Sequence, residues 1–285
     1  MARFELSAFS DELSADFERQ LEGMAERNIG LIEIRGVFGK NISEVSESEA
    51  HEIKKMLDLY GIGLSAIGSP LGKINIQGDM AGHLELTKRI TNIANILGCS
   101  KIRGFSFYGT NDDDKDTVVE AVGKMTDITY AGGVLFCHEN EKGIYGDTPE
   151  KCLLLKHELG DFLGVVFDPA NFIQCGRVPY PVAYEMLAED ITYVHIKDSD
   201  AYGTVMPAGE GIGRIPEMLT ALNVRNEDII LTLEPHLRVF DGLDALEGGE
   251  KSLIGGGYRT SEEAFDAAVN AIRGIMKNVG VAEIR

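Results

Sequence analysis

The chain has 285 residues, of which 44% are hydrophobic and 26% are charged. This length fits one large domain or two modest ones, and the composition excludes extensive disorder. With 46 acidic and 27 basic side chains, the formal net charge is −19, which disfavours nucleic acid and anionic membrane surfaces as partners. The start of the chain lacks an apolar signal core, and no run has the length of a spanning helix, so we expect no membrane association.

The cysteine pattern bears on the cellular compartment. Cys99, Cys137, Cys152 and Cys175 lie far apart and form no C-x-x-C pair. In a chain of this size, the spacing predicts buried free thiols in a reducing environment rather than a disulfide framework. We therefore expect a cytoplasmic protein.

Short runs rich in β-branched and aromatic residues alternate with helical patterns along the whole chain. The expected strands cover residues 4–9, 30–37, 63–67, 101–108, 133–138, 163–167, 191–196 and 229–233. The expected helices cover residues 14–27, 48–60, 80–97, 111–129, 148–159, 182–187, 215–222 and 261–276.

This alternation predicts an α/β protein with a parallel sheet, because parallel neighbours need a crossover element. Eight strand–helix units in a chain of this length fit a closed (β/α)8 TIM barrel. An open doubly wound sheet is the alternative, but Ser7-Ala8-Phe9-Ser10 stands where its G-x-G-x-x-G turn would be. No Pro/Gly/Ser-rich linker divides the sequence, so residues 1–285 are predicted to form one domain.

Four successive expected strands end in a polar residue that can ligate a metal. These residues are Glu139, Asp168, His195 and Glu234. In a barrel they would meet at the C-terminal rim, where three carboxylates and an imidazole need a positive charge between them. Each carboxylate alone is as readily explained as a helix cap, and His195 alone as a hydrogen-bonded core residue. The set of four at equivalent positions favours one divalent ion, with Mn²⁺ first and Mg²⁺, Co²⁺ or Zn²⁺ as alternatives.

The segments around these residues resemble those of a known group of proteins, the xylose-isomerase-like TIM-barrel superfamily (AP endonuclease family 2, sugar phosphate isomerase/epimerase branch). The segments are His138-Glu139-Asn140, Phe167-Asp168-Pro169-Ala170-Asn171, Val194-His195-Ile196-Lys197-Asp198 and Leu233-Glu234-Pro235. The resemblance covers nearly the whole chain. It implies that Glu139, Asp168, His195 and Glu234 hold one metal ion, and that Glu139 and Glu234 are the catalytic pair that moves a proton on a bound sugar.

The resemblance therefore implies a metal-dependent isomerase or epimerase in carbohydrate metabolism, acting on a sugar or sugar phosphate through an enediolate. A lyase or dehydratase acting on a keto-inositol or a 3-keto-glycoside is the first alternative, because it begins with the same proton abstraction. A non-catalytic sugar-binding barrel is the second alternative, disfavoured because recognition needs no proton-transfer pair. Homo-oligomer formation is possible for such a barrel, but no segment marks an interface.

Further polar residues near the expected rim are candidates for binding substrate: Lys197, His236, Arg35, Lys73, Asn171 and Arg103. Each has a structural interpretation as well, such as a rim salt bridge. Glu33 and Arg35 alternate on the second strand, and we interpret them first as an ion pair inside the barrel.

Two other features narrow the function. The endonuclease IV branch carries further zinc-binding histidines, one of them at the position of Asn171, so DNA repair is disfavoured. Ketose 3-epimerases commonly have a sugar-contacting histidine at this position too. Its absence here weakens the case for that specific activity. The glycine-rich stretch 207–213 resembles a phosphate loop only weakly, and we interpret it as a flexible turn at the rim.

Overall fold

Eight parallel strands close into a barrel in the computed structural model, which describes residues 2–225, 227–240, 253–255 and 257–284. Each strand pairs with the next barrel strand along the chain, and the last pairs with the first over the register Arg3↔Asp228 to Ala8↔Leu233. The barrel strands are β1 (Arg3–Ala8), β2 (Leu31–Ile34), β5 (Gly63–Gly68), β6 (Lys101–Gly104), β7 (Leu135–Glu139), β8 (Leu163–Phe167), β9 (Ile191–Ile196) and β12 (Asp228–Leu233). The predicted (β/α)8 barrel is confirmed.

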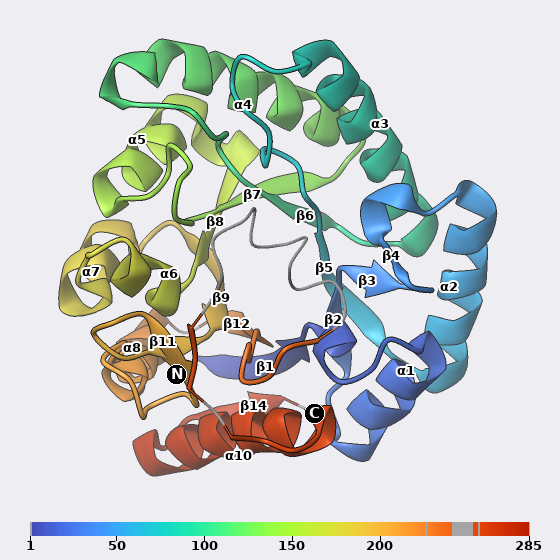
Figure 1. Ribbon diagram of the computed structural model, residues 1–285, viewed down its shortest axis with the longest axis vertical. Coiled ribbons are helices and arrows are strands. Elements are labelled where there is room, and N and C mark those ends of the chain that lie inside the picture. Colours follow the sequence, from blue (N-terminus) through green and yellow to red (C-terminus); the bar gives the residue numbers. More distant parts are fainter. Residues whose placement is uncertain (1, 226, 241–252, 256, 285) are drawn as a thin grey trace.

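Helices surround the barrel on its outside (Figure 1). In chain order they are α1 (Phe17–Glu26), α2 (Glu47–Tyr60), α3 (Met80–Leu97), α4 (Lys115–Ala131), α5 (Pro149–Leu159), α6 (Pro169–Gln174), α7 (Tyr184–Leu187), α8 (Ile215–Leu222) and α10 (Ser261–Val279). Within the described ranges, none of these helices is both long and apolar enough to cross a membrane.

The remaining short strands are not members of the closed ring of eight, although β14 pairs in parallel with β1. They are β3 (Gly36–Val37), β4 (Lys40–Asn41), β10 (Asp198–Ser199), β11 (Thr204–Met206), β13 (Leu253–Ile254) and β14 (Ala282–Ile284). The second barrel strand is shorter than the expected strand over residues 30–37. After Ile34 the chain turns into the β3–β4 hairpin. The expected fourth strand likewise ends at Gly104, and Tyr108 instead forms isolated bridges with Asn75 and Ile144.

Local sequence signals set the helix ends. The side chain of Ser46 accepts the backbone N–H of Glu49, and the Glu49 carboxylate accepts the N–H of Ser46, so a capping box starts α2. The same helix stops at Gly61, whose φ of 66° is the left-handed conformation that glycine adopts without strain. Such caps fix where each crossover returns to the barrel.

The outer side of the barrel wall is apolar, whereas the interior contains polar side chains beside a small apolar cluster of Ala66, Cys137 and Val166. On β9, Val194 and Ile196 belong to the large apolar core between strands and helices, whereas Tyr193 and His195 face the barrel interior. The interior also contains a buried hydrogen bond of 2.7 Å between the hydroxyls of Ser7 and Ser65. This alternation directs every second side chain of a strand toward the barrel axis.

The four cysteines are free thiols, as expected. Cys99, Cys137 and Cys152 are buried, while Cys175 is half-buried, so the prediction of burial is wrong for Cys175. Burial raises the pKa of Cys137 to about 12, which leaves this thiol protonated and unreactive near neutral pH.

Candidate functional site

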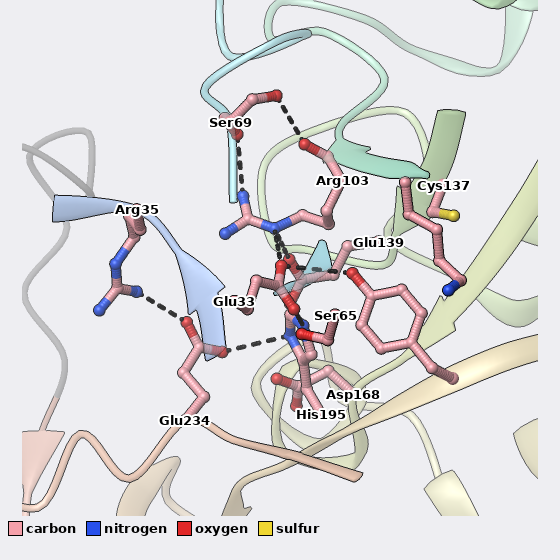
Figure 2. Close-up of polar contacts among 12 residues, drawn as sticks. Glu33, Arg35, Ser65, Ser69, Arg103, Cys137, Glu139, Asp168, His195 and Glu234 are labelled. Carbon is pink, nitrogen blue, oxygen red and sulfur yellow. Dashed lines mark hydrogen bonds and ion pairs between the residues drawn. The ribbon is translucent and has the colours of Figure 1, made fainter. Parts of the chain in front are cut away.

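The four rim residues lie together at the C-terminal end of the barrel. Glu139 ends β7, Asp168 follows β8, His195 lies on β9 and Glu234 follows β12. One donor atom from each of the four lies within 4.8 Å of the others, and all four residues are buried. Figure 2 shows Glu139, Asp168, His195 and Glu234 converging from their strands.

The chemistry of this donor set fits a divalent metal ion. Three carboxylates and one imidazole are ligands that Mn²⁺, Mg²⁺ and Zn²⁺ share. With metal–ligand distances of about 2.2 Å, two donors on opposite sides of one ion are about 4.4 Å apart. The observed spread of up to 4.8 Å is therefore close to what a single ion requires.

His195 is held on both of its ring nitrogens. Nδ1 is 2.9 Å from Oε1 of Glu139 and 3.5 Å from Oε2 of Glu234. Nε2 is 3.0 Å from Oε2 of Glu33, on the other side of the ring. The Phe9 ring meets the imidazole edge-on, with centroids 5.3 Å apart. The imidazole is therefore fixed by hydrogen bonds and by packing.

Asp168 uses its two carboxylate oxygens differently. Oδ1 accepts the backbone N–H of Asn171 at 2.9 Å and so caps α6, as the structural interpretation expects. Oδ2 accepts no hydrogen bond from the described residues and forms an ion pair with Lys197 Nζ at 2.9 Å. The same ammonium lies 2.9 Å from Oε2 of Glu234. Asp168 is thus both a helix cap and a member of the group of donors.

Each of the two glutamates has its own guanidinium partner (Figure 2). Arg103 Nε lies 3.2 Å from Oε2 of Glu139, and Arg35 Nη1 donates to Oε1 of Glu234 at 3.1 Å. The interpretation of Glu33 and Arg35 as an ion pair is wrong. Glu33 instead contacts Arg103 and His195, because Arg35 extends toward Glu234 and toward Asp11, to which it donates two hydrogen bonds of 2.9 and 3.0 Å.

Aromatic rings pack against both arginines. The guanidinium carbon of Arg35 lies 4.2 Å from the ring centroid of Phe9 and 5.1 Å from that of Phe240. The corresponding carbon of Arg103 is 4.7 Å from the centroid of Phe105. Stacking and carboxylate partners together allow these two charges to be buried.

Burial and mutual charge shift the pKa values of the site in different directions. Burial alone would raise the pKa of Glu139, but His195 and Arg103 lower it to about 2. For Glu234, burial is outweighed mainly by Lys197, and the pKa is held well below its usual range. Burial raises the pKa of Asp168 to about 7 even though Lys197 opposes this. The two glutamates are therefore ionised near neutral pH, as a metal ligand or a general base requires.

The site opens into a cavity of about 710 Å³. Each candidate for binding substrate lines this cavity: Arg35, Lys73, Arg103, Asn171, Lys197 and His236. Lys73 forms an ion pair with Glu141 at 3.4 Å, and Asn171 Nδ2 donates to Oε1 of Glu139 at 3.2 Å. Asn171 thus supports Glu139 as well as facing the cavity.

His236 follows Glu234 by two residues and is buried at the cavity wall. Its backbone N–H donates to Oε2 of Glu12 at 2.7 Å, and its φ of 44° is unusual for a residue other than glycine. Its Nε2 has no hydrogen-bond partner among the described residues. Burial lowers the pKa of His236 to about 3, so the ring is neutral near pH 7.

The glycine-rich stretch 207–213 is organised around an internal carboxylate. Asp198 accepts backbone N–H groups from Gly209 at 2.8 Å, Gly211 at 3.2 Å and Gly213 at 2.8 Å. These N–H groups are therefore used within the protein and do not form a phosphate site. The sequence indicated a turn here, and the structure adds that Asp198 fixes it.

Sequence reasoning missed several members of the site. Asp11 and Glu12 lie in a 3-10 helix (Ser10–Glu12) directly after β1, and Asn140 donates to the carbonyl oxygen of Asp168 at 2.9 Å. The sequence could have indicated Asn140 as a site residue, since it follows Glu139 at the end of a strand. Asp11 and Glu12 gave no such signal, because two acidic residues at the start of a helix are ordinarily explained by the helix dipole.

This chain is a (β/α)8 barrel with a buried carboxylate–imidazole group at its C-terminal rim. It belongs to the xylose isomerase-like TIM barrel family, whose model matches residues 24–253. No curated protein sequence matches the chain at a significant level.

Solved structures share this fold at low sequence identity. The IOLI protein with a bound zinc atom has a TM-score of 0.72 and 19% identity, covering 96% of this chain and 99% of that chain. D-psicose 3-epimerase from Clostridium cellulolyticum H10 has a TM-score of 0.70 and 14% identity, covering 96% and 99%. The probable 3-DHS dehydratase AsbF from Bacillus anthracis has a TM-score of 0.67 and 18% identity, covering 82% and 92%. At these identities the likeness establishes the fold alone.

Proposed function

We propose that this protein is a divalent-metal-dependent isomerase or epimerase acting on a sugar or sugar phosphate. The observation that carries the proposal is the meeting of Glu139 and Glu234 with Asp168 and His195 in one buried group that opens into a cavity. Recognition of a sugar needs hydrogen-bonding groups, but it does not need a buried group of three carboxylates. Proton transfer does need paired acid–base groups.

Glu139, Asp168, His195 and Glu234 are the proposed ligands of the ion, and Mn²⁺ is our first choice. A divalent ion, when bound, supplies positive charge that stabilises the oxygen anion formed when a proton is removed next to a carbonyl. Zinc, magnesium and cobalt use the same donor types. The zinc atom in the IOLI structure supports a metal on this fold.

In the proposed reaction, one of the two glutamates removes a proton from the carbon next to the carbonyl. The other glutamate returns a proton to the opposite face of that carbon, or the proton is returned to the neighbouring carbon. Arg103 holds Glu139 and Arg35 holds Glu234, so neither carboxylate must reorganise before it reacts. Lys197 and His236 at the cavity wall are the proposed contacts to substrate oxygens.

A lyase acting on an oxidised sugar is the second candidate, because elimination begins with the same proton abstraction. It would need an acid above the leaving group. Near neutral pH His236 is a neutral hydrogen-bonding group, and the Lys197 ammonium is shared by Asp168 and Glu234. These two observations favour the isomerase or epimerase.

Solvent exchange distinguishes the candidates. Protein loaded with Mn²⁺ is incubated in D₂O with a panel of ketoses and ketose phosphates, and NMR and mass spectrometry follow the products. We expect deuterium at a carbon next to the carbonyl, without loss of water. An elimination product would favour the lyase, and the absence of exchange with every sugar, from protein that binds the metal, would favour a binding module and contradict the proposal.

A further inference from the structure

Glu33 is a buried carboxylate that the proposed reaction does not use. It lies on β2, where the pairing with β5 shifts register between Ile32 and Glu33. The extra residue lies in β5, and β2 keeps its alternation: Ile32 and Ile34 pack in the outer apolar core, whereas Glu33 faces the barrel interior with no exposed surface. Figure 2 shows it against His195, Arg103 and Glu139.

The two oxygens of Glu33 have separate partners. Oε2 is 3.0 Å from His195 Nε2. Oε1 accepts the hydroxyl of Tyr193 at 3.2 Å and lies 3.4 Å from Arg103 Nε. A carboxylate only accepts hydrogen bonds, so Nε2, which faces Glu33, carries a proton, and by the same argument Nδ1, 2.9 Å from Oε1 of Glu139, carries one in the metal-free protein.

The two nitrogens differ in their surroundings, because Nε2 faces Glu33, which is not among the four residues of the donor group, whereas Nδ1 faces two residues that are. With Nε2–H donated to Glu33, Nδ1 is the nitrogen that faces Glu139 and Glu234. The ring does not turn over easily, because Phe9 and Tyr193 pack edge-on against it with centroids 5.3 and 5.5 Å away. A histidine ligand whose other N–H meets a carboxylate is fixed in tautomer and orientation and is a stronger ligand.

A simpler interpretation makes Glu33 only a counter-ion for Arg103, but the distances argue against this. Arg103 Nε is closer to Glu139, at 3.2 Å, and Nη1 donates to the carbonyl of Ser69 at 3.0 Å. The contact of Arg103 with Glu33 is the longest of the three. The shortest contact of Glu33 is the one with His195.

We propose that Glu33 is a positioning residue that holds the proton of His195 on Nε2 and so presents Nδ1 to a divalent ion. This inference rests on the proposed function, since it assigns a role beside the metal group that function requires. Glu33 is not itself a proposed ligand. It lies on β2 and supports one of the four proposed ligands, His195, from behind its ring.

The test uses Zn²⁺ as the probe and compares the wild-type protein with Glu33→Gln and Glu33→Ala. Zn²⁺ affinity is measured by calorimetry in competition with a chelator. We expect binding about 10- to 100-fold weaker in Glu33→Ala. The Zn²⁺ affinity of Glu33→Gln is expected to lie between those of the wild type and Glu33→Ala, because the amide oxygen still accepts the Nε2–H but carries no charge. Tyr193→Phe is the matched control: it removes another partner of Glu33, and its Zn²⁺ affinity is expected to stay near that of the wild type.

A spectroscopic signature separates positioning from mere structural support. In ¹⁵N NMR of the wild-type protein with Zn²⁺, we expect the metal on Nδ1 of His195 and a retained, hydrogen-bonded proton on Nε2. That proton signal should shift in Glu33→Gln. Zinc on Nε2 in the wild type, or wild-type Zn²⁺ affinity in a folded Glu33 variant, overturns the inference alone. A wild-type protein that binds no divalent ion would instead overturn the proposed function.

Discussion

The two halves of the barrel contribute different kinds of residue to one site. The half from β7 to β12 provides all four donors that the described residues bring to the candidate metal group. The half from β1 to β6 provides Glu33, Arg35 and Arg103, which contact those donors from the side. One half therefore contains the groups proposed to react, together with Lys197, which pairs with Asp168 and Glu234, and the other half adds further groups that fix and neutralise them.

This division has an energetic reason. Three carboxylates that are buried without partners would each carry a large desolvation cost, so the fold must bring opposite charges to them. Arg35 and Arg103 are nearly fully buried, and their own charges are compensated only because the carboxylates are present. Neither half of the site is stable in its observed form without the other.

The largest effect is expected from the half proposed to react. Glu139→Gln and Glu234→Gln keep the size of the side chain but remove the carboxylate that transfers the proton. Turnover should fall by about 10²- to 10⁴-fold in each, while far-UV circular dichroism shows a folded barrel. Glu120→Gln, on the exposed surface of α4, is the control. Activity retained in either site variant would break the proposed two-base scheme.

A substitution in the half from β1 to β6 should lower the stability of the protein. Arg35→Met keeps an unbranched side chain but leaves Asp11 and Glu234 without their guanidinium. We expect the free energy of unfolding to drop by about 3–5 kcal/mol, measured by urea denaturation of the metal-free protein. Arg3→Met, which breaks the exposed pair with Asp228, should change little. Equal effects of the two substitutions would contradict the importance of the buried pair.

The last expected effect is a gradual one, the pH dependence of stability. Burial raises the pKa of Glu12 from its ordinary 4.5 to about 8, although Arg35 opposes this. Between these two values the folded protein holds a proton that the unfolded chain releases, so stability falls as pH rises through this window. One such group contributes at most about 1.4 kcal/mol per pH unit.

Glu12→Gln cannot titrate, so it tests this assignment. Its free energy of unfolding, measured from pH 5 to pH 8 in the metal-free protein, should decline less steeply than that of the wild type. Parallel curves for the two proteins would show that Glu12 does not have the raised pKa.

The sequence predicted much of the architecture and the residues that the structure brings together in the donor group. Apolar runs covered by helices are visible as local patterns, and a polar residue that ends such a run is visible as well. Glu139, Asp168 and Glu234 gave this signal, and His195 gave it within its strand. Where local patterns misled, as for the strand ends near Ile34 and Gly104, the chain turns although apolar residues continue.

What the sequence determined by itself was the repeating alternation of strand and helix and the residues that stand at strand ends, because both depend on neighbours a few positions away. Only the tertiary structure decided the partners: Arg35 with Glu234 across 199 positions, and Glu33 with His195 across 162. Closing the barrel brings β1 against β12 and turns alternate side chains toward one axis. Buried charges then pair with the opposite charges that the closed barrel brings next to them. A local sequence pattern does not show which residues these are.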